Sequence, residues 1–201
     1  MAIKVPTSEV GLMLGLTNYQ GDLVEPTFDF GVSNFAFGAY YGKYFSEKLT
    51  GKLSLLIGGI SGDDANYESR VVRGIKLENG SLTAISLGVD YYIVGANQYR
   101  SDKNTAIYIN GGLGFALFNA EPTGLNPDKM EADDSSAFSV MLGGGIKQHL
   151  SEKFALGLEL SFRPVFSDLL DGVSQNGNPD NNDTYVWLGL TASYQLGDKN
   201  N

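Results

Sequence analysis

The feature that most constrains this chain is a strict alternation of large apolar residues with small or polar ones. At residues 10–17, VGLMLGLT, four large apolar side chains occupy the even positions and mostly small ones the odd positions. A period of two residues is that of a β-strand, whose side chains point alternately to opposite faces. The same pattern recurs seven more times, and the eight predicted strands contain Val10–Thr17, Phe35–Gly42, Leu53–Gly58, Ile85–Tyr92, Ile107–Leu117, Phe138–Lys147, Phe154–Arg163 and Tyr185–Leu196.

The connections between these strands alternate in length. FSEKLT, GANQYRSDKN and HLSEK are short, whereas the connections at about 20–33, 61–80, 119–136 and 167–183 are long. The strands are about ten residues long, the length that a tilted strand needs to cross a bilayer. Short turns at one rim and long loops at the other are typical of a transmembrane up-and-down barrel. The sequence therefore predicts an all-β fold, an eight-stranded antiparallel barrel with short periplasmic turns and long extracellular loops.

The long loops carry most of the 23 acidic residues of the chain. We therefore expect an acidic extracellular rim, although soluble proteins also gather acidic residues in solvated loops. Asn79-Gly80, in the second long connection, is the strongest short hairpin signal. It predicts an additional hairpin in which 72–77 pairs with 82–87.

The polarity of the two strand faces decides between a membrane barrel and a soluble one. A soluble, lipocalin-like barrel places its large apolar face inside and a polar face in water. Here the second face is rich in Gly, Ala and Ser, and only 18% of the chain is charged, so it makes a poor solvated surface. Small residues suit the narrow interior of eight strands, and the large apolar residues suit lipid. The membrane barrel is favoured, and the soluble binding barrel is the alternative.

Composition also excludes several function classes. The chain has no Cys, so it has neither disulfides nor a Cys-based metal site. His149 is the single histidine, and its place in a short turn predicts a solvent-facing side chain. A net charge of −9 argues against nucleic-acid binding. We expect no enzymatic activity, no catalytic residue, no metal and no cofactor.

The first ten residues lack the apolar region of a secretory signal. Two explanations are open, a cytoplasmic protein or a mature chain from which the signal has been removed. The barrel pattern favours the second, with the native signal peptide removed and the protein in the bacterial outer membrane. We expect one barrel domain over 1–201, with strands from about residue 8 to 197 and tails at 1–7 and 198–201.

Four ionisable residues fall on the predicted inward face, and we expect them to form a charge network in the lumen. They are Asp90, Lys147, Glu159 and Arg163. Isolated buried ions are costly, so Glu159 is expected to pair with Arg163 or Lys147. A structural role in a plugged lumen is favoured over a proton or ion path, because eight strands leave no wide pore. Four aromatic residues are expected to fill the remaining space: Tyr40, Tyr92, Tyr108 and Trp187.

Aromatic residues near the strand ends predict a girdle at the membrane interfaces. The candidates are Tyr19, Tyr44, Phe45, Tyr91, Phe166 and Tyr194. The final strand also resembles the C-terminal signal read by the outer-membrane assembly machinery. Gly189, Tyr194 and Leu196 would carry that signal.

Several segments resemble the PorG-like outer-membrane β-barrel proteins of Bacteroidota, a wider domain family largely of unknown function. They are EVGLMLGLTNYQGDL near the start, SGDD, GGGIKQHLSEKFALGLELSFRPVFSDLLDGVS and the closing ASYQL. The resemblance covers nearly the whole chain. It implies an outer-membrane barrel, and a PorG-like member is similar to an accessory component of the type IX secretion machinery that contacts a periplasmic ring of other subunits. It transfers no binding residues to this sequence.

Together these patterns predict a non-enzymatic outer-membrane barrel with a plugged lumen. Its expected partners are outer-membrane lipids and the periplasmic or outer-membrane proteins of a larger, type IX secretion-like assembly. The alternative is a ligand-binding or adhesin barrel that uses its acidic loops. No small-molecule ligand can be named from the sequence.

Overall fold

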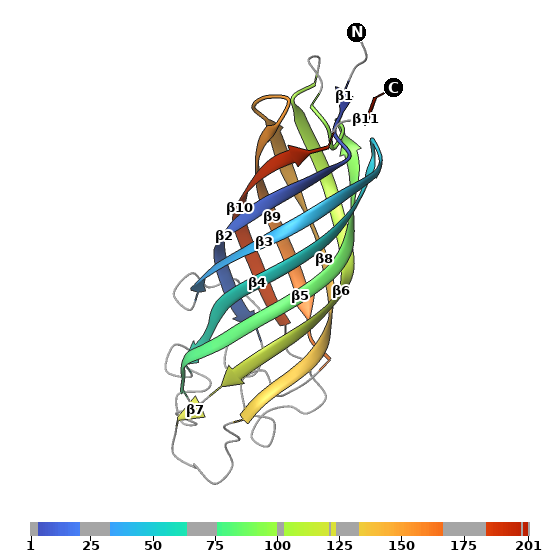
Figure 1. Cartoon of the computed structure of the whole chain (residues 1–201). Coiled ribbons are helices and arrows are strands. Elements are labelled where there is room, and N and C mark those ends of the chain that lie inside the picture. Colours follow the sequence, from blue (N-terminus) through green and yellow to red (C-terminus); the bar gives the residue numbers. More distant parts are fainter. Residues whose placement is uncertain are drawn as a thin grey trace.

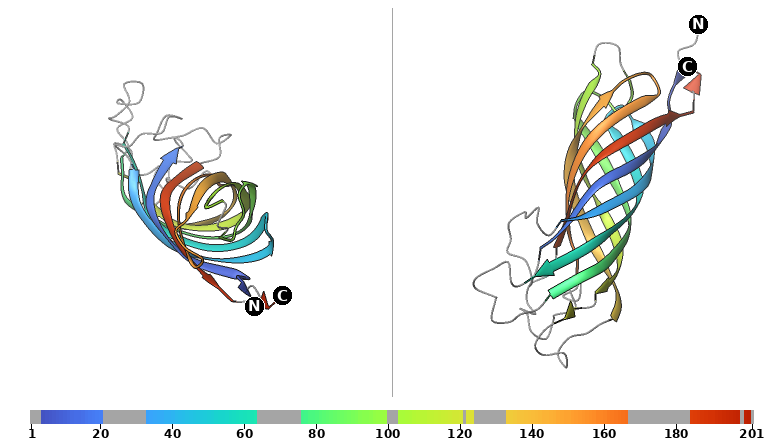
Figure 2. Two further views of the ribbon diagram at one scale, coloured as in Figure 1. Left: turned by 90° about the horizontal axis from the view of Figure 1, so that it is seen from above. Right: turned by 90° about the vertical axis from the view of Figure 1, so that its left-hand side faces the viewer.

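The computed structural model describes residues 4–20, 33–63, 76–99, 103–120, 122–123, 133–166, 184–197 and 199–200. Most of these residues lie in eight long strands: β2 (Ser8–Gln20), β3 (Ser33–Ser46), β4 (Leu49–Asp63), β5 (Lys76–Val94), β6 (Thr105–Ala120), β8 (Asp133–His149), β9 (Phe154–Pro164) and β10 (Thr184–Leu196). The strands neighbour one another in the order β4-β3-β2-β10-β9-β8-β6-β5, and β4 also pairs with β5. This last pairing closes the sheet, and every pairing is antiparallel (Figures 1 and 2). The predicted eight-stranded up-and-down barrel is therefore confirmed.

Three short strands accompany the eight long ones. β1 (Lys4–Val5) pairs with β11 (Lys199–Asn200), so each predicted tail carries a short strand. β7 (Pro122–Thr123) pairs with the beginning of β5 at Lys76 and Leu77.

The two ends of the barrel differ in their connections. At the end that we call the turn end, β3 joins β4 through 47–48, β5 joins β6 through 95–104, and β8 joins β9 through 150–153. Both chain termini lie at this end (Figure 1). The opposite end, which we call the loop end, carries the long connections, whose predicted acidic rim falls largely outside the described residues.

Four neighbouring strands extend further toward the loop end than predicted. β4 and β5 remain paired as far as Asp63 and Lys76, and β6 and β8 as far as Ala120 and Asp133. The predicted hairpin at Asn79-Gly80 is wrong, because both residues lie within β5 and Gly80 pairs with Ile60 of β4. The flanks of this dipeptide pair with β4 rather than with each other, and a register shift between Ile60 and Gly62 accommodates the extension.

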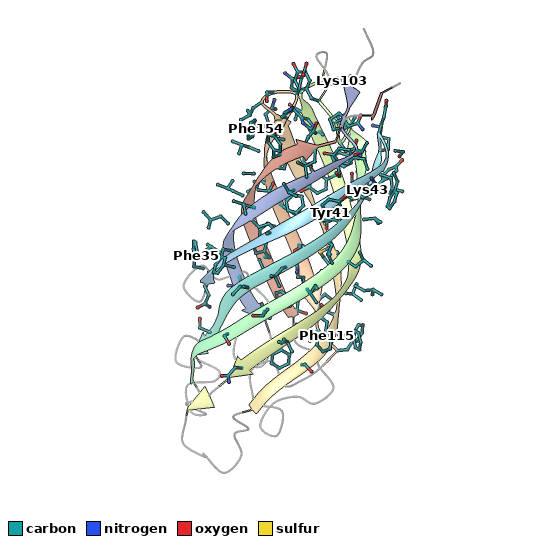
Figure 3. All side chains as sticks on the ribbon, viewed as in Figure 1. Phe35, Tyr41, Lys43, Lys103, Phe115 and Phe154 are labelled. Atoms are coloured by element: carbon teal, nitrogen blue, oxygen red, sulfur yellow. The ribbon has the colours of Figure 1, made fainter. Side chains whose placement is uncertain are left out.

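The faces of the strands follow the sequence alternation. The large apolar residues point away from the barrel axis, and several are more than half exposed, including Leu12 at 69%, Leu113 at 67% and Phe138 at 69%. Figure 3 shows Phe35 and Phe154 pointing outward from the wall. The small and polar residues point inward, so the buried core of the molecule is the lumen. Gly15 of β2 and Gly189 of β10 pair directly, and a Cβ on Gly15 would overlap the β10 backbone.

Candidate functional site

The lumen contains a buried ion cluster built from three strands. Lys52 of β4 lies with its Nζ 2.7 Å from Glu159 Oε2 of β9 and 3.1 Å from Asp90 Oδ1 of β5. The Tyr108 hydroxyl of β6 donates to the same Glu159 oxygen at 2.7 Å. These three charged side chains are at most 4% exposed. A lysine held between two carboxylates provides the charge compensation that buried carboxylates require.

A second ion pair lies nearer the turn end. Lys147 Nζ of β8 is 2.7 Å from Glu9 Oε1 of β2, and both side chains are buried. The Tyr44 hydroxyl of β3 donates to the other oxygen of Glu9 at 3.0 Å. This pair crosses the lumen and joins strands that are not neighbours in the sheet.

Tyrosine rings lie between the two clusters. Tyr92 and Tyr108 contact each other with their ring centroids 5.3 Å apart. Lys147 Nζ lies 5.5 Å from the Tyr92 ring centroid, and Lys52 Nζ lies 5.5 Å from the centroids of Tyr40 and Tyr108. Because an aromatic face attracts a cation, these rings add to the electrostatic stabilisation of both lysines.

Arg163 is the third buried cation of the lumen. Its Nε donates to the Ser161 hydroxyl at 3.1 Å, its Nη1 donates to the Ser86 hydroxyl at 3.3 Å, and its guanidinium lies 5.7 Å from the Tyr185 ring centroid. Among the described residues, the buried cations Lys52, Lys147 and Arg163 equal in number the buried carboxylates Glu9, Asp90 and Glu159. The described interior is therefore neutral overall.

At the turn end, the β5–β6 connection turns back against the barrel interior after Gly95, whose φ is +72°. Ala96 and Asn97 are buried there. The Asn97 side-chain amide donates to the Thr50 hydroxyl at 2.9 Å and to the Ser46 carbonyl at 2.7 Å, and Gln195 donates to the Asn97 carbonyl at 3.0 Å. This connection is therefore hydrogen-bonded to β3, β4 and β10.

Toward the loop end, several large apolar side chains are buried in the lumen together with Arg163. The fully buried side chains there include Leu56, Leu82, Val165 and Trp187, none more than 2% exposed. Tyr185 is also fully buried. The large buried apolar side chains therefore lie toward the loop end, and the Lys52 and Lys147 ion pairs lie closer to the turn end.

The structure corrects the predicted pairing of the lumen charges. Asp90, Lys147, Glu159 and Arg163 are all buried, but Glu159 pairs with Lys52, and Lys147 pairs with Glu9. Sequence reasoning missed Lys52 and Glu9, although the alternation places both on the inward face beside Ser54 and Gly11. The contacts themselves join residues 107 and 138 positions apart, and no local pattern reports on such pairs.

Two further predictions are corrected. Tyr44 is predicted to belong to the aromatic girdle, but it lies in the lumen and bonds Glu9, because adjacent residues such as Tyr44 and Phe45 cannot share a strand face. His149 is predicted to face solvent, but it is 2% exposed. β8 continues to this residue, which faces inward, and its Nε2 lies 3.3 Å from the Ala96 carbonyl of the β5–β6 connection.

The remaining aromatic candidates have different environments. Phe45, Tyr91 and Phe166 are exposed on the outside, and Tyr194 packs edge-on against Phe154 with centroids 4.9 Å apart. The Tyr19 side chain is outside the described set. The girdle itself stays a prediction, as does the assembly signal at Gly189, Tyr194 and Leu196, of which Gly189 lies against the Trp187 ring inside the barrel.

Among the described residues there is no group of three or more His, Asp or Glu side chains arranged to hold a metal ion. The described part of the chain also has no helix long and apolar enough to cross a membrane.

Comparison with protein-family models gives a match over residues 1–201 to a domain of unknown function, DUF6089. The chain belongs to the DUF6089 family. No curated protein matches this family member by sequence.

Comparison with solved structures gives matches to outer-membrane barrels. Neisserial surface protein A aligns with a TM-score of 0.61 and 8% identity, covering 94% of this chain and 97% of that protein. Ail, the attachment invasion locus protein of Yersinia pestis, aligns with a TM-score of 0.53 and 13% identity over 95% and 99% of the two chains. A major outer membrane protein from Thermus thermophilus gives a TM-score of 0.52 and 16% identity over 94% and 99%. At these identities the likeness shows the fold of this DUF6089 protein, and its structural neighbours are outer-membrane β-barrels.

Proposed function

We propose that this protein is a non-enzymatic barrel of the bacterial outer membrane, with a plugged lumen, that anchors or assists a larger envelope assembly. The observation that carries the proposal is the inversion of the faces. Large apolar side chains cover the outside, while six ionised side chains are buried inside. A soluble barrel has the opposite arrangement, and lipid is the surrounding in which an apolar outer face is stable.

Three features support a plugged lumen. At the turn end, Ala96 and Asn97 are buried and hydrogen-bonded to several strands. In the middle, the Lys52 and Lys147 ion pairs and the tyrosine rings span the interior. Toward the loop end, Leu56, Leu82, Val165 and Trp187 are buried. Eight strands enclose an interior just wide enough to be filled by side chains, so these three layers support a lumen that is closed to water.

The plug is tested by conductance of the purified protein in planar bilayers. We expect no steady channel at neutral pH and moderate salt. The Asn97→Gly and Lys52→Ala variants remove parts of two layers, and Lys43→Ala, an exposed residue on β3, is the matched control. A stable open channel in the unaltered protein contradicts the plugged lumen.

Support for an assembly role comes from the segments that resemble PorG-like barrels, which imply contact with periplasmic subunits of a type IX secretion-like machine. In the proposed orientation the turn end faces the periplasm. Leu150, which is 62% exposed in the β8–β9 turn, and the exposed Lys48 and Lys153 lie at this end. A partner that binds at the turn end would contact these three residues.

The assembly role is tested by photo-crosslinking in cells of the native organism. A photoreactive residue is placed singly at Leu150, Lys48 or Lys153, and at Phe166 and Ser136 toward the loop end as matched positions. We expect discrete adducts with envelope proteins from the turn end, and loss of those adducts when Leu150→Glu is combined with a crosslinker at Lys153. Adducts from Phe166 and Ser136 alone favour the binding or adhesin alternative and overturn the accessory role.

A further inference from the structure

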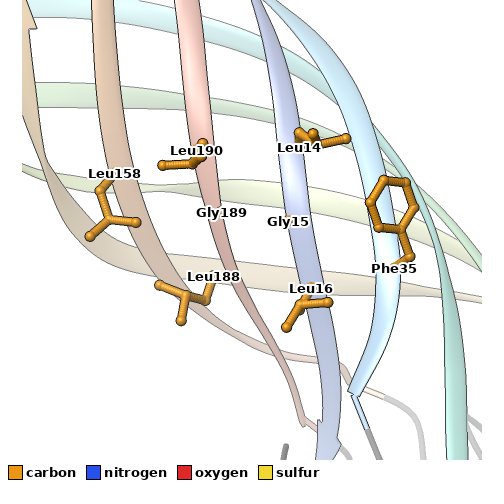
Figure 4. Close-up of a pocket in the computed structure, with 8 residues that line it drawn as sticks. All are labelled: Leu14, Gly15, Leu16, Phe35, Leu158, Leu188, Gly189 and Leu190. Carbon is orange, nitrogen blue, oxygen red and sulfur yellow. The ribbon is translucent and has the colours of Figure 1, made fainter.

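The seam between the first and last long strands carries an apolar groove on the outside of the barrel. It lies over β2 and β10, reaches β3 and β9, and has a volume of about 330 Å³. Its walls are formed by the side chains of Leu14, Leu16, Phe35, Leu158, Leu188 and Leu190 (Figure 4). All six are hydrocarbon side chains, so the groove offers a ligand no side-chain hydrogen bond and no charge.

The floor of the groove is bare backbone. Gly15 and Gly189, which pair directly across the seam, occupy its centre. In Figure 4, Leu14 and Leu190 lean away from each other on either side of these glycines. On the inner side, the Trp187 ring lies against Gly189, so the wall is backed by a packed side chain and does not open into the lumen.

The surroundings of the groove indicate what fills it. Leu12, Leu14 and Leu190 are exposed beside it, and they belong to the apolar outer face that continues around the barrel. An occupant must therefore be apolar, narrow and able to follow an irregular surface, and it must come from the medium that covers this face. A hydrocarbon chain has all of these properties, because apolar contact needs no directional partner.

We infer that this groove seats an acyl chain of a membrane lipid at the β2–β10 seam. The inference rests on the proposed placement of the barrel in a membrane. A second copy of the chain fits less well, because a stable protein interface engages roughly 20 to 30 residues on each side, far more than the residues that line this groove.

The test is nuclear Overhauser transfer from lipid to protein in nanodiscs. The protein is perdeuterated except for its amides and its leucine methyl groups, and the phosphatidylethanolamine carries protonated acyl chains. We expect transfer from chain CH₂ groups to the Gly15 and Gly189 amides to be several-fold stronger than transfer to Ala84 and Ala116. This reference pair also faces inward and pairs directly, but it is flanked outside by Ile85 and Phe115.

A filling variant gives the decisive comparison. Leu188→Phe places a larger side chain in the groove and is expected to reduce transfer to the two glycine amides to the level of Ala84 and Ala116. Leu113→Phe adds the same volume on β6, outside the groove, and is expected to leave that transfer unchanged.

Three results would overturn the acyl-chain seat. Equal transfer to the glycine and alanine amides, with strong transfer to the leucine methyl groups, means that lipid covers the wall without entering the groove. Transfer from a second, differently labelled copy to Gly15 means that protein occupies the groove. Absence of lipid transfer at Leu87 and Leu113 as well contradicts the membrane placement itself, so the two failures are distinguishable.

Discussion

Lys52 of β4 contacts or approaches side chains of four other strands in the lumen. Its ammonium group contacts carboxylates of β5 and β9 and lies near tyrosine rings of β3 and β6. Burying a lone carboxylate is expensive, and removing one partner of a buried ion pair typically costs about 3–5 kcal/mol. The alternation in the sequence places Lys52 inside, but its partners come from strands whose mutual register only the closed barrel determines.

Replacing Lys52 tests this role. Lys52→Met leaves Asp90 and Glu159 buried without their cation, so we expect the free energy of unfolding to fall by about 3 kcal/mol or more. Urea unfolding in lipid vesicles, followed through the fluorescence of the single residue Trp187, measures the change. Lys43→Met, at an exposed position of β3, is the matched control and is expected to change stability little. Equal effects of the two variants would contradict the role assigned to Lys52.

Two glycines differ sharply in the space around them. A Cβ on Gly15 would overlap the backbone at Leu188 and Gly189, whereas a Cβ on Gly111 would meet its nearest atoms at 3.7 Å, an ordinary contact. We expect Gly15→Ala to destabilise the barrel by about 1–3 kcal/mol and Gly111→Ala to be nearly neutral. The same unfolding assay measures both, and a neutral Gly15→Ala would show that β2 and β10 are further apart than described.

At the scale of elements, the β5–β6 connection shows what sequence reasoning could not supply. GANQYRSDKN is visible as a turn, yet nothing local indicates that Asn97 is buried and bonded to Thr50 and Ser46. The existence of all eight strands was predictable, because alternation is a local signal. The predicted hairpin at Asn79-Gly80 does not form, because pairing with β4 overrides the local turn preference of this dipeptide. Tyr44, by contrast, was within reach, since strict alternation already places it opposite Phe45.

Asn97→Ala tests the anchoring of this connection. Removing the side-chain amide leaves the Thr50 hydroxyl and the Ser46 carbonyl without this donor. Such a loss lowers the free energy of unfolding by about 1–3 kcal/mol when the groups are buried. We expect the backbone N–H of residue 97, which donates to the Glu47 carbonyl, to exchange with solvent at least tenfold faster in the variant. Asn104→Ala changes an exposed residue of the same connection and is the control. Unchanged exchange in Asn97→Ala would mean that the backbone contacts alone hold the connection.

As a whole molecule, the barrel is inverted relative to a soluble one, because its outside is apolar and its inside holds equal numbers of buried cations and carboxylates among the described residues. The sequence alone predicts this arrangement in outline. The side chains on the face rich in Gly, Ala and Ser are too small and too weakly charged to form a solvated surface. The ion pairs that make the interior stable, and the extension of β4, β5, β6 and β8 toward the loop end, required the closed structure.

The absence of cysteine makes the most direct measurement simple, because single spin labels can be placed without a cysteine-free background variant. Labels are attached in turn along β6 from Ile107 to Leu117 in protein reconstituted into lipid vesicles, and their collision rates with oxygen and with a water-soluble nickel complex are recorded. We expect a period of two residues, with high oxygen and low nickel collision rates at Ile109, Leu113 and Leu117. High nickel collision rates at these outward positions would contradict a lipid-facing barrel.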